Sequence, residues 1–393
     1  MAVKNTACTP SAGISGTRGK GKIHLVWGLL WLLCPVSLGL VAYAKGHPDW
    51  VERAYSLSFF PKWSALLSSV SGRLPFSLAE VLLILFGAGV LYALIRYIIR
   101  LKKSPEERLR ISGRFWMWAG ALGSALLFLF VIGGGLNYYR YSFTEYSGLI
   151  LRPQTAARLR DMTLELAGTT NILRTRVAED ENGVFILLKG AAGAAEEARL
   201  AYQCLTEENP QWEELLRRGG EVTPKRVFFS EAMSYMQIVG FYFPFTMEAN
   251  VNVHTSPIDI PSAMCHELAH ICGFMREDEA NYIAWRACMA SENDDLRYSG
   301  AVTALIYCLN ALSGSSPEFH DQVMETVSES VRRDLEADSA YYRKYQTSFG
   351  TFSSAVNDVY LRMNDQAEGV QSYGRLVDLM LAQYERDGSL PAA

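Results

Sequence analysis

Hydrophobic residues concentrate in three long runs in the first third of the chain. Residues 25–44, 75–99 and 115–136 are each long enough to cross a bilayer as a helix, and only Glu80 and Arg96 carry charge within them. The alternative for each run is a helix buried in a soluble protein, which the length and the lack of a polar stripe disfavour. The pattern therefore predicts three transmembrane helices.

Lysine and arginine flank these runs unevenly. They precede the first run and fill the short loop between the second and the third, and the positive-inside rule places both regions in the cytoplasm. We therefore predict a cytoplasmic tail over residues 1–23, a membrane domain over 24–136 and an extracytoplasmic domain over 137–393.

Two features of the N-terminal part leave alternatives. The first run lacks a clear cleavage site, so we interpret it as an uncleaved anchor rather than as a signal peptide. The 45–74 segment is predicted to be a loop on the outer side. Its aromatic stretch 59–63 fits either a position in the lipid interface or a plain loop.

The remaining residues alternate between helical and extended patterns, which predicts an α+β outer domain that is mostly helical with a small sheet. The helices are expected over 155–166, 191–216, 301–312, 318–334, 353–364 and 372–384, and the strands over 226–229, 236–243 and 249–255. In the last strand, small apolar residues alternate with Asn250, Asn252 and His254. We expect this strand to lie at a sheet edge, either beside a cleft that takes an extended peptide or simply half in solvent.

Composition narrows the function classes. Hydrophobic residues make up 49% and charged residues 20% of the chain, and the net charge of −4 gives no indication of nucleic-acid binding. The seven cysteines are an odd number, so no complete disulfide framework is expected. Those of the outer domain are interpreted as small buried residues, including Cys265 and Cys272 beside the motif described next.

Residues 266–270 read His-Glu-Leu-Ala-His. Residues four apart share one face of a helix, so His266 and His270 can direct two imidazoles at one metal ion, and Glu267 then lies beside it as a general base. The alternative is an ordinary helix with two histidines near its surface. The residue types favour Zn²⁺ as the cofactor.

The third ligand is expected on the next helical run. Glu277 shares a stripe with Ala280, Ala284 and Cys288, and a carboxylate at the buried start of a helix requires a partner or a metal. Glu277 is therefore the preferred ligand, and Glu279 is the reserve candidate. Asn281 could orient a ligand from behind.

These strings resemble two known groups of proteins. His-Glu-Leu-Ala-His followed by Glu-Asp-Glu-Ala-Asn at 277–281 resembles the gluzincin class of zinc metallopeptidases, in which a glutamate on a later helix is the third ligand. Segments 240–252, 260–281 and 369–379 are similar to the DUF3810 family of bacterial membrane proteins. The resemblance implies a zincin-like outer domain and a location in the bacterial cell membrane. Only six residues separate His270 from Glu277, and this spacing demands a tight turn.

We interpret the chain as a membrane-anchored zinc metallopeptidase that hydrolyses a peptide or protein on the outer side. Tyr373 and Arg375 are the candidate donors to the developing oxyanion, and Tyr360 is another. His254 is interpreted as structural. The alternative function is a membrane sensor or interaction protein whose zinc site performs no turnover. An intramembrane protease and a transporter are both disfavoured, because the motif lies outside the apolar runs and these runs show no repeat.

Overall fold

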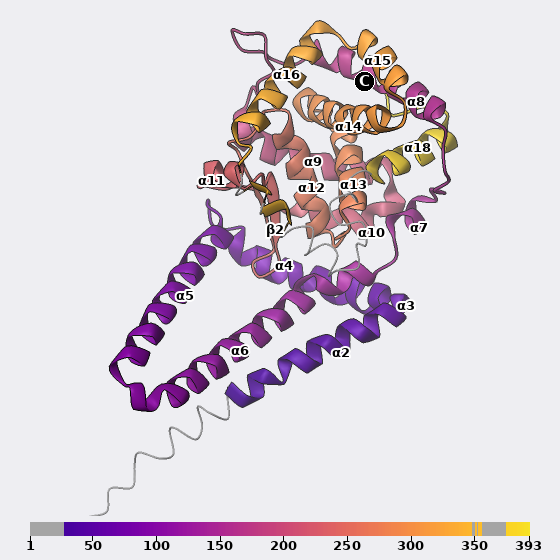
Figure 1. Cartoon of the computed structure of the whole chain (residues 1–393). Coiled ribbons are helices and arrows are strands. Elements are labelled where there is room, and N and C mark those ends of the chain that lie inside the picture. The colour runs from indigo at the N-terminus through magenta and orange to yellow at the C-terminus, as the bar shows by residue number, and fades with distance from the viewer. Residues whose placement is uncertain (1–26, 348–349, 352, 356–374) are drawn as a thin grey trace, which may run out of the picture. The chain divides into compact units, whose positions relative to one another are not determined.

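The computed structural model describes residues 27–347, 350–351, 353–355 and 375–393. Contacts divide the chain into two compact units, Met1–Ala42 with Ala88–Val131, and Tyr43–Gly87 with Ile132–Ala393. Figure 1 shows the order of the elements along the chain.

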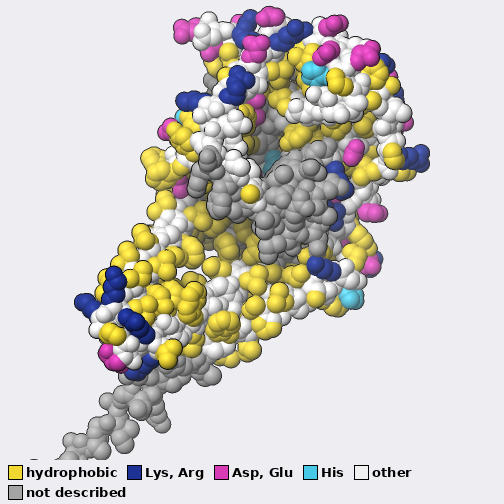
Figure 2. All heavy atoms as spheres, viewed as in Figure 1, with side chains coloured by type: hydrophobic (Ala, Val, Ile, Leu, Met, Phe, Trp, Pro, Cys, Tyr) yellow, Lys and Arg dark blue, Asp and Glu magenta, His cyan; other side chains and the backbone are white. Residues whose placement is uncertain are grey.

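The first unit is built from apolar helices. Among the described residues, three helices are long and apolar enough to cross a membrane: Trp27–Gly46, Leu78–Lys103 and Pro105–Gly133. They contain α2 (Leu33–Gly46), α5 (Leu78–Lys103), the short η2 (Pro105–Glu107) and α6 (Arg108–Gly133). Hydrophobic side chains cover α5 and α6, and Lys and Arg gather where the two helices join (Figure 2). The three expected apolar helices are therefore confirmed, whereas their orientation stays a prediction.

The expected loop at 45–74 is helical instead. It forms α3 (Pro48–Trp50), the π-helix η1 (Val51–Phe59) and α4 (Phe60–Ser71). The reason is that one face of η1 is buried against η3 (Gly135–Tyr139). Tyr55 donates to the carbonyl of Ile132 over 2.9 Å, and Ser56 donates to Asn137 Oδ1 over 2.7 Å. These partners lie about 80 residues away in the chain, so the local pattern could not indicate them.

Helices form most of the second unit. They are α7 (Phe143–Ser147), α8 (Ala156–Arg174), α9 (Gly190–Glu208), η4 (Pro210–Trp212), α10 (Glu213–Leu216), η5 (Arg217–Glu221), α11 (Ser230–Tyr235), α12 (Asp259–Ile271), α13 (Glu277–Ala290), α14 (Asp294–Ser315), α15 (Pro317–Thr326), α16 (Glu329–Lys344) and α18 (Leu376–Asp387). The expected single helix over 318–334 is thus divided between α15 and α16. Ser328 caps the N-terminus of α16 by accepting from the Val331 amide.

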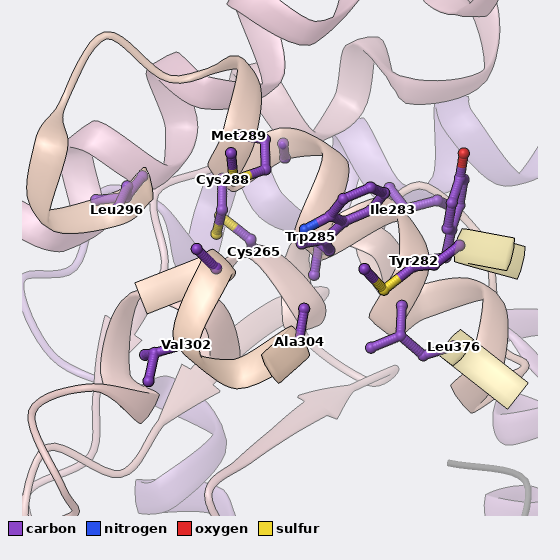
Figure 3. Close-up of a cluster of buried hydrophobic side chains, with 14 of the residues drawn as sticks. Cys265, Tyr282, Ile283, Trp285, Cys288, Met289, Leu296, Val302, Ala304 and Leu376 are labelled. Atoms are coloured by element: carbon purple, nitrogen blue, oxygen red, sulfur yellow. The ribbon is translucent and has the colours of Figure 1, made fainter. Parts of the chain in front are cut away.

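The core of this unit lies between α8, α9, α12, α13 and α14, which pack side by side. Figure 3 shows part of it, where Cys265 of α12 meets Cys288 of α13 and the large rings of Tyr282 and Trp285 fill the neighbouring space. Cys265, Cys272, Cys288 and Cys308 are buried free thiols, as expected, whereas Cys204 is half-buried.

A three-stranded sheet with the order β1-β3-β2 lies beside α12. β1 (Lys225–Arg226) pairs parallel with β3 (Glu248–Val251), which pairs antiparallel with β2 (Gly240–Phe243). The expectation of an edge strand at 249–255 was therefore wrong, because β3 is central and fully buried. Asn250 lies in this interior and accepts a hydrogen bond from Ser77 over 2.6 Å. Among the described strands, β2 is the edge that adjoins α12.

A buried ion pair joins the 43–87 segment to the rest of the second unit. Arg140 donates to Glu52 over 2.6 Å, and their side chains are 1% and 3% exposed. Arg140 also donates to the carbonyl of Cys272 over 3.3 Å and lies 4.2 Å above the ring of Phe274. This pair therefore fixes the turn that follows α12.

Replacing one partner of this pair should destabilise the protein. Glu52→Gln leaves Arg140 buried without its counter-charge, so we expect a loss of about 3–5 kcal/mol, or a decrease in Tm of about 10 °C in detergent. The matched control is Glu107→Gln, because Glu107 pairs with Arg110 at a site where both side chains are more than half exposed. Equal melting temperatures for the two variants would contradict a structural role for the buried pair.

Candidate metal centre

The His-Glu-Leu-Ala-His motif lies near the C-terminal end of α12, and a glycine turn ends this helix directly after the motif. Gly273 has a φ of +86°, which favours glycine. Its amide donates to the carbonyl of His270 over 2.9 Å, and the amide of Phe274 donates to that of Ala269 over 3.1 Å. These two bonds form a Schellman motif, which reverses the chain within a few residues. The tight turn that the short spacing demands is therefore present, and α13 begins at Glu277.

The structure brings His266, His270 and Glu277 together. Glu277 Oε2 lies 3.1 Å from His266 Nε2, and Glu277 Oε1 lies 3.8 Å from His270 Nε2. One ligand atom from each of the three side chains falls within 4.8 Å of the others. The two imidazole planes are nearly perpendicular, at 89°. Three donor groups from two helices thus converge on one point.

Hydrogen bonds behind the imidazoles fix which nitrogen faces this point. His266 Nδ1 lies 2.8 Å from Asn281 Oδ1, and His270 Nδ1 lies 2.7 Å from the carbonyl oxygen of Phe274. Both oxygens are acceptors, so each Nδ1 carries a proton and each Nε2 faces Glu277. In its neutral form, each ring can then offer the lone pair of Nε2 to a metal ion. Asn281 thereby takes the orienting position expected for it.

The donor set fits zinc. Two imidazole nitrogens and one carboxylate are the protein ligands of an open tetrahedral site, whose fourth position is available to water or substrate. With bonds of about 2.0–2.2 Å, neighbouring ligand atoms in such a site are about 3.3–3.6 Å apart. The observed separations between Glu277 oxygens and the two Nε2 atoms, 3.1 and 3.8 Å, lie on either side of this range.

Glu279 is directed elsewhere, although it is as buried as Glu277. Its carboxylate accepts from the Phe143 amide over 3.0 Å and from Arg276 over 2.9 Å. The Glu279 carboxylate is therefore bound to the N-terminus of α7 and to Arg276, and not to the histidines. Of the two acidic candidates, only Glu277 lies with the histidines.

Glu267 lies next to the three ligands but is not one of them. Its side chain is buried, and its Oε2 has no hydrogen-bond partner among the described residues. Burial raises the pKa of Glu267 to about 8, and the charge of Glu277 adds to this shift whereas His266 opposes it. Gly240 of β2 allows this close packing, since a Cβ there would lie 2.5 Å from Glu267 Oε1.

The two histidines differ in their protonation. Burial lowers the pKa of His266, but the hydrogen bond and charge of Glu277 outweigh burial and raise this pKa to about 9. Burial lowers the pKa of His270 to about 4, and the weaker attraction of Glu277 does not compensate. The cluster thus holds positive charge at His266 in the absence of a metal, at the place where a metal cation would lie.

A cavity of about 760 Å³ opens in front of this cluster, a size typical of ligand sites. Figure 2 shows a hollow in this face of the second unit with a histidine side chain inside it. Residues 236–242, which end in β2, line one side, and α12, α13 and α14 line the others. The edge strand therefore borders the cavity, together with His266, Glu267, His270 and Glu277.

The chain shares its sequence pattern with one known family over most of its length. A family model described as a protein of unknown function (DUF3810) matches residues 55–381. The chain belongs to the DUF3810 family. The match spans α5, α6 and most of the region after α6 in this DUF3810 protein, including His266, Glu267, His270 and Glu277. No curated protein and no solved structure matches the chain.

Of the three proposed oxyanion donors, the structure describes only Arg375. Tyr373 and Tyr360 fall outside the described residues. Arg375 is exposed at the start of α18, and its charge acts on Asp278. Its neighbour Leu376 lines the cavity, whereas Arg375 does not. The role of Arg375 stays a prediction.

His254 also lies apart from the cluster. It is exposed, and its carbonyl accepts hydrogen bonds from Ser234 and Tyr341. The structural role expected for His254 stays a prediction.

Two features of the cavity were missed by the sequence analysis. Tyr307 of α14 lines it, and burial together with the charges of Glu277 and Asp259 raises the pKa of Tyr307 to about 12. Asp259 of α12 and Asp338 of α16 line it as well. The spacing of Asp259 on the motif helix, seven residues before His266, was the available signal for that residue. No local pattern indicates the other two.

Asp259 should make the stability of the protein depend on pH. Burial and the charge of Asp338 raise its pKa from 3.8 to about 7, against the opposing hydrogen bonds from Tyr342 and Thr255. The fold therefore favours the protonated carboxyl, so its contribution to stability is complete below about pH 4 and is lost as the pH rises to about 7. Asp259→Asn replaces the titratable carboxyl by a neutral amide, so the decrease in stability with rising pH should disappear.

We expect Asp259→Asn to melt a few degrees above the wild type at pH 8, and to show a smaller change in Tm between pH 5 and 8. Thermal scans of the detergent-solubilised protein measure this. Asp321→Asn is the control, because the Asp321 side chain is 79% exposed. The same pH profile for Asp259→Asn and the wild type would refute the assignment.

Proposed function

We propose that this DUF3810 protein is a membrane-anchored, zinc-dependent metallopeptidase that hydrolyses peptide bonds on the extracytoplasmic side. The observation that carries the proposal is the convergence of His266 Nε2, His270 Nε2 and the Glu277 carboxylate beside a buried Glu267 with an unpartnered oxygen. Three protein ligands leave a position for chemistry, and the adjacent carboxylate supplies a base.

The residues of the site would have three roles: metal binding, orientation of the imidazoles and proton transfer. His266, His270 and Glu277 would hold the zinc ion, and Asn281 and the Phe274 carbonyl keep both imidazoles in the tautomer that binds metal. When bound, zinc supplies a Lewis acid that polarises a carbonyl and promotes ionisation of water. Glu267 accepts a proton from the attacking water and passes it to the leaving amine, for which a pKa near neutrality is suited.

Tyr307 is our candidate for the oxyanion donor among the described residues of the cavity, because the charge of Glu277 acts on its phenol. Of the three other tyrosines in the lining, Tyr242 donates to the carbonyl of Gly133 over 2.7 Å, and Tyr342 donates to Asp259 over 2.7 Å. The raised pKa of Tyr307 keeps its phenol protonated at neutral pH, so it can donate to a negative oxygen.

The edge strand β2 supports an extended peptide as the substrate. Gly240, Phe241 and Tyr242 border the cavity, and β3 occupies only one side of their strand. A peptide can add to the other side through main-chain hydrogen bonds. This assigns to β2 the role that the sequence pattern had suggested for β3.

The charge of the cavity favours some substrates over others. Its described lining includes the carboxylates of Asp259, Glu267, Glu277 and Asp338, and none of the described lining residues is Lys or Arg. A divalent cation suits such a lining, whereas an acidic peptide finds no Lys or Arg there with which to pair. A sensor or interaction protein with a zinc site remains the alternative, although such a site has no use for Glu267 as a base.

Single substitutions should affect zinc content and peptide hydrolysis differently. The purified full-length protein should contain about one zinc per chain, and both His266→Ala and Glu277→Gln should lose it. Glu267→Gln should keep the zinc and lose at least about 100-fold in chelator-sensitive peptide hydrolysis. Elemental analysis and a fluorogenic peptide library measure the two properties.

Glu279→Gln is the matched control for Glu277→Gln. Glu279 lies on the same helix, α13, and is also buried, but its carboxylate binds the Phe143 amide and not the histidines. It should keep both zinc and turnover in samples whose melting curve shows a folded protein. Full activity of Glu267→Gln would exclude the proposed base, and zinc without any hydrolysis in the wild type would favour the sensor.

Tyr307→Phe tests the oxyanion donor. The loss of one donor that acts only in the transition state should lower kcat about 100-fold and leave KM nearly unchanged. Tyr342→Phe is the control, because that hydroxyl lines the same cavity but is bonded to Asp259. Steady-state kinetics on one peptide measure both variants, and a Tyr307→Phe enzyme with the kcat of the control would return the role to another residue.

A further inference from the structure

We propose that the outer domain rests on the surface of the lipid bilayer through a defined apolar surface, called here the lipid-facing surface. It consists of one face of α4 with the preceding residue (Phe59, Trp63, Leu66 and Val70) and of the tip formed by Phe228 and Phe229. The bound partner is the interfacial region of a phospholipid bilayer.

The first part of this surface is a helical stripe. Phe59, Trp63, Leu66 and Val70 follow one another at intervals of four, three and four residues, so they share one face. Phe59 is 42% exposed, and Leu66 and Val70 are each 59% exposed. A neighbouring face, about 110° around the helix, buries Phe60, Ser64 and Ser71 against the protein. A helix that packs one face on its domain and leaves a second apolar face in the open has the amphipathic pattern of an interfacial helix.

The second part is the aromatic tip after β1. Phe228 is 85% exposed and Phe229 is 53% exposed, although large apolar side chains are usually at least partly covered. The tip is not loose, because the Glu80 carboxylate accepts from both amides, over 3.0 Å and 2.7 Å. Glu80 belongs to the first turn of α5. The two rings are thus held beside the start of an apolar helix.

The length of α5 places this start at the level of a membrane surface. A hydrocarbon core of about 30 Å requires about 20 helical residues at about 1.5 Å each. Arg100 begins the basic end of α5. Counting 20 residues back from it leads to Glu80, which is the residue that binds the aromatic tip. The rings of Phe228 and Phe229 therefore lie at the depth where aromatic side chains gather in membrane proteins.

Further contacts connect β1 with the segment between α4 and α5. Lys225 donates to the carbonyls of Ser71 and Phe76 over 2.6 Å and 2.9 Å, and Glu248 of β3 accepts from the amides of Leu78 and Ala79. The helical stripe and the aromatic tip are therefore fixed to the same end of α5. The exposed cations Lys62, Arg73 and Arg226 lie in these segments and suit phosphate headgroups.

The lipid-facing surface adjoins the start of α5, and this position favours lipid over a second protein copy as its partner. The lipid-facing surface adjoins a helix that is apolar enough to span a membrane, so its two parts reach the bilayer without any rearrangement. α11 (Ser230–Tyr235) follows the tip and leads into the residues that border the cavity. Contact with the bilayer would thus hold one wall of the cavity in place.

Photo-crosslinking tests the proposal in the intact protein. The photoreactive residue p-benzoylphenylalanine is introduced at Leu66 or at Phe228 of the full chain, which is then reconstituted into vesicles of phosphatidylcholine and phosphatidylglycerol. Both sites are exposed, so the fold should tolerate the change, and melting curves verify this. Leu188 is the matched control, because it is an apolar residue of the same unit that is 75% exposed but lies outside the surface.

We expect phospholipid adducts, identified by mass, to be at least ten times more abundant at positions 66 and 228 than at position 188. Adducts at the level of position 188 would overturn the proposal. Crosslinks from position 66 or 228 to a second copy of the chain, in place of lipid, would also overturn it and would identify the surface as a protein interface.

Discussion

Three metal-ligand groups that repel one another unless a proton or a cation lies between them determine the character of the site. The Nδ1–H groups of His266 and His270 donate to Asn281 and to the Phe274 carbonyl, so the Nε2 atom of each ring faces the carboxylate of Glu277. Buried acceptors placed face to face are unfavourable unless a cation lies between them. A proton on His266 relieves part of the repulsion, which is why its pKa is raised. A divalent cation relieves it fully.

The backbone makes this arrangement possible through one turn. Gly273 lets α12 end in a Schellman motif and α13 begin at Glu277, and the same turn presents the Phe274 carbonyl to His270. A Cβ at Gly273 would lie 2.9 Å from Asn137 and 3.1 Å from Phe60. The turn is thus enclosed by the segment between the first two apolar helices and by the residues that follow the third. Folding of those segments and formation of the cluster are coupled physically.

The sequence was informative where the determinants are local. The metal-binding motif depends on neighbours in the sequence: the spacing of His266 and His270, the helix stop at Gly273 and the stripe that contains Glu277. Each apolar run is likewise recognised from its own residues. Features that depend on distant partners could not be predicted. β2 rather than β3 borders the cavity because of the pairing order, residues 45–74 are helical because η3 covers η1, and Tyr307 reaches the site from another helix. The zincin-like fold and the peptidase activity stay proposals that rest on the cluster.

The most direct test of the central claim is zinc K-edge X-ray absorption on the purified full-length protein. The account predicts one zinc per chain with a first shell of nitrogen and oxygen only, at about 2.0–2.2 Å, and with the outer-shell signal of two imidazoles. Sulfur scattering at about 2.3 Å would instead indicate thiolate ligation, for instance by Cys265 or Cys272, and would contradict the assignment of His266, His270 and Glu277. So would a purified, folded protein that binds no zinc.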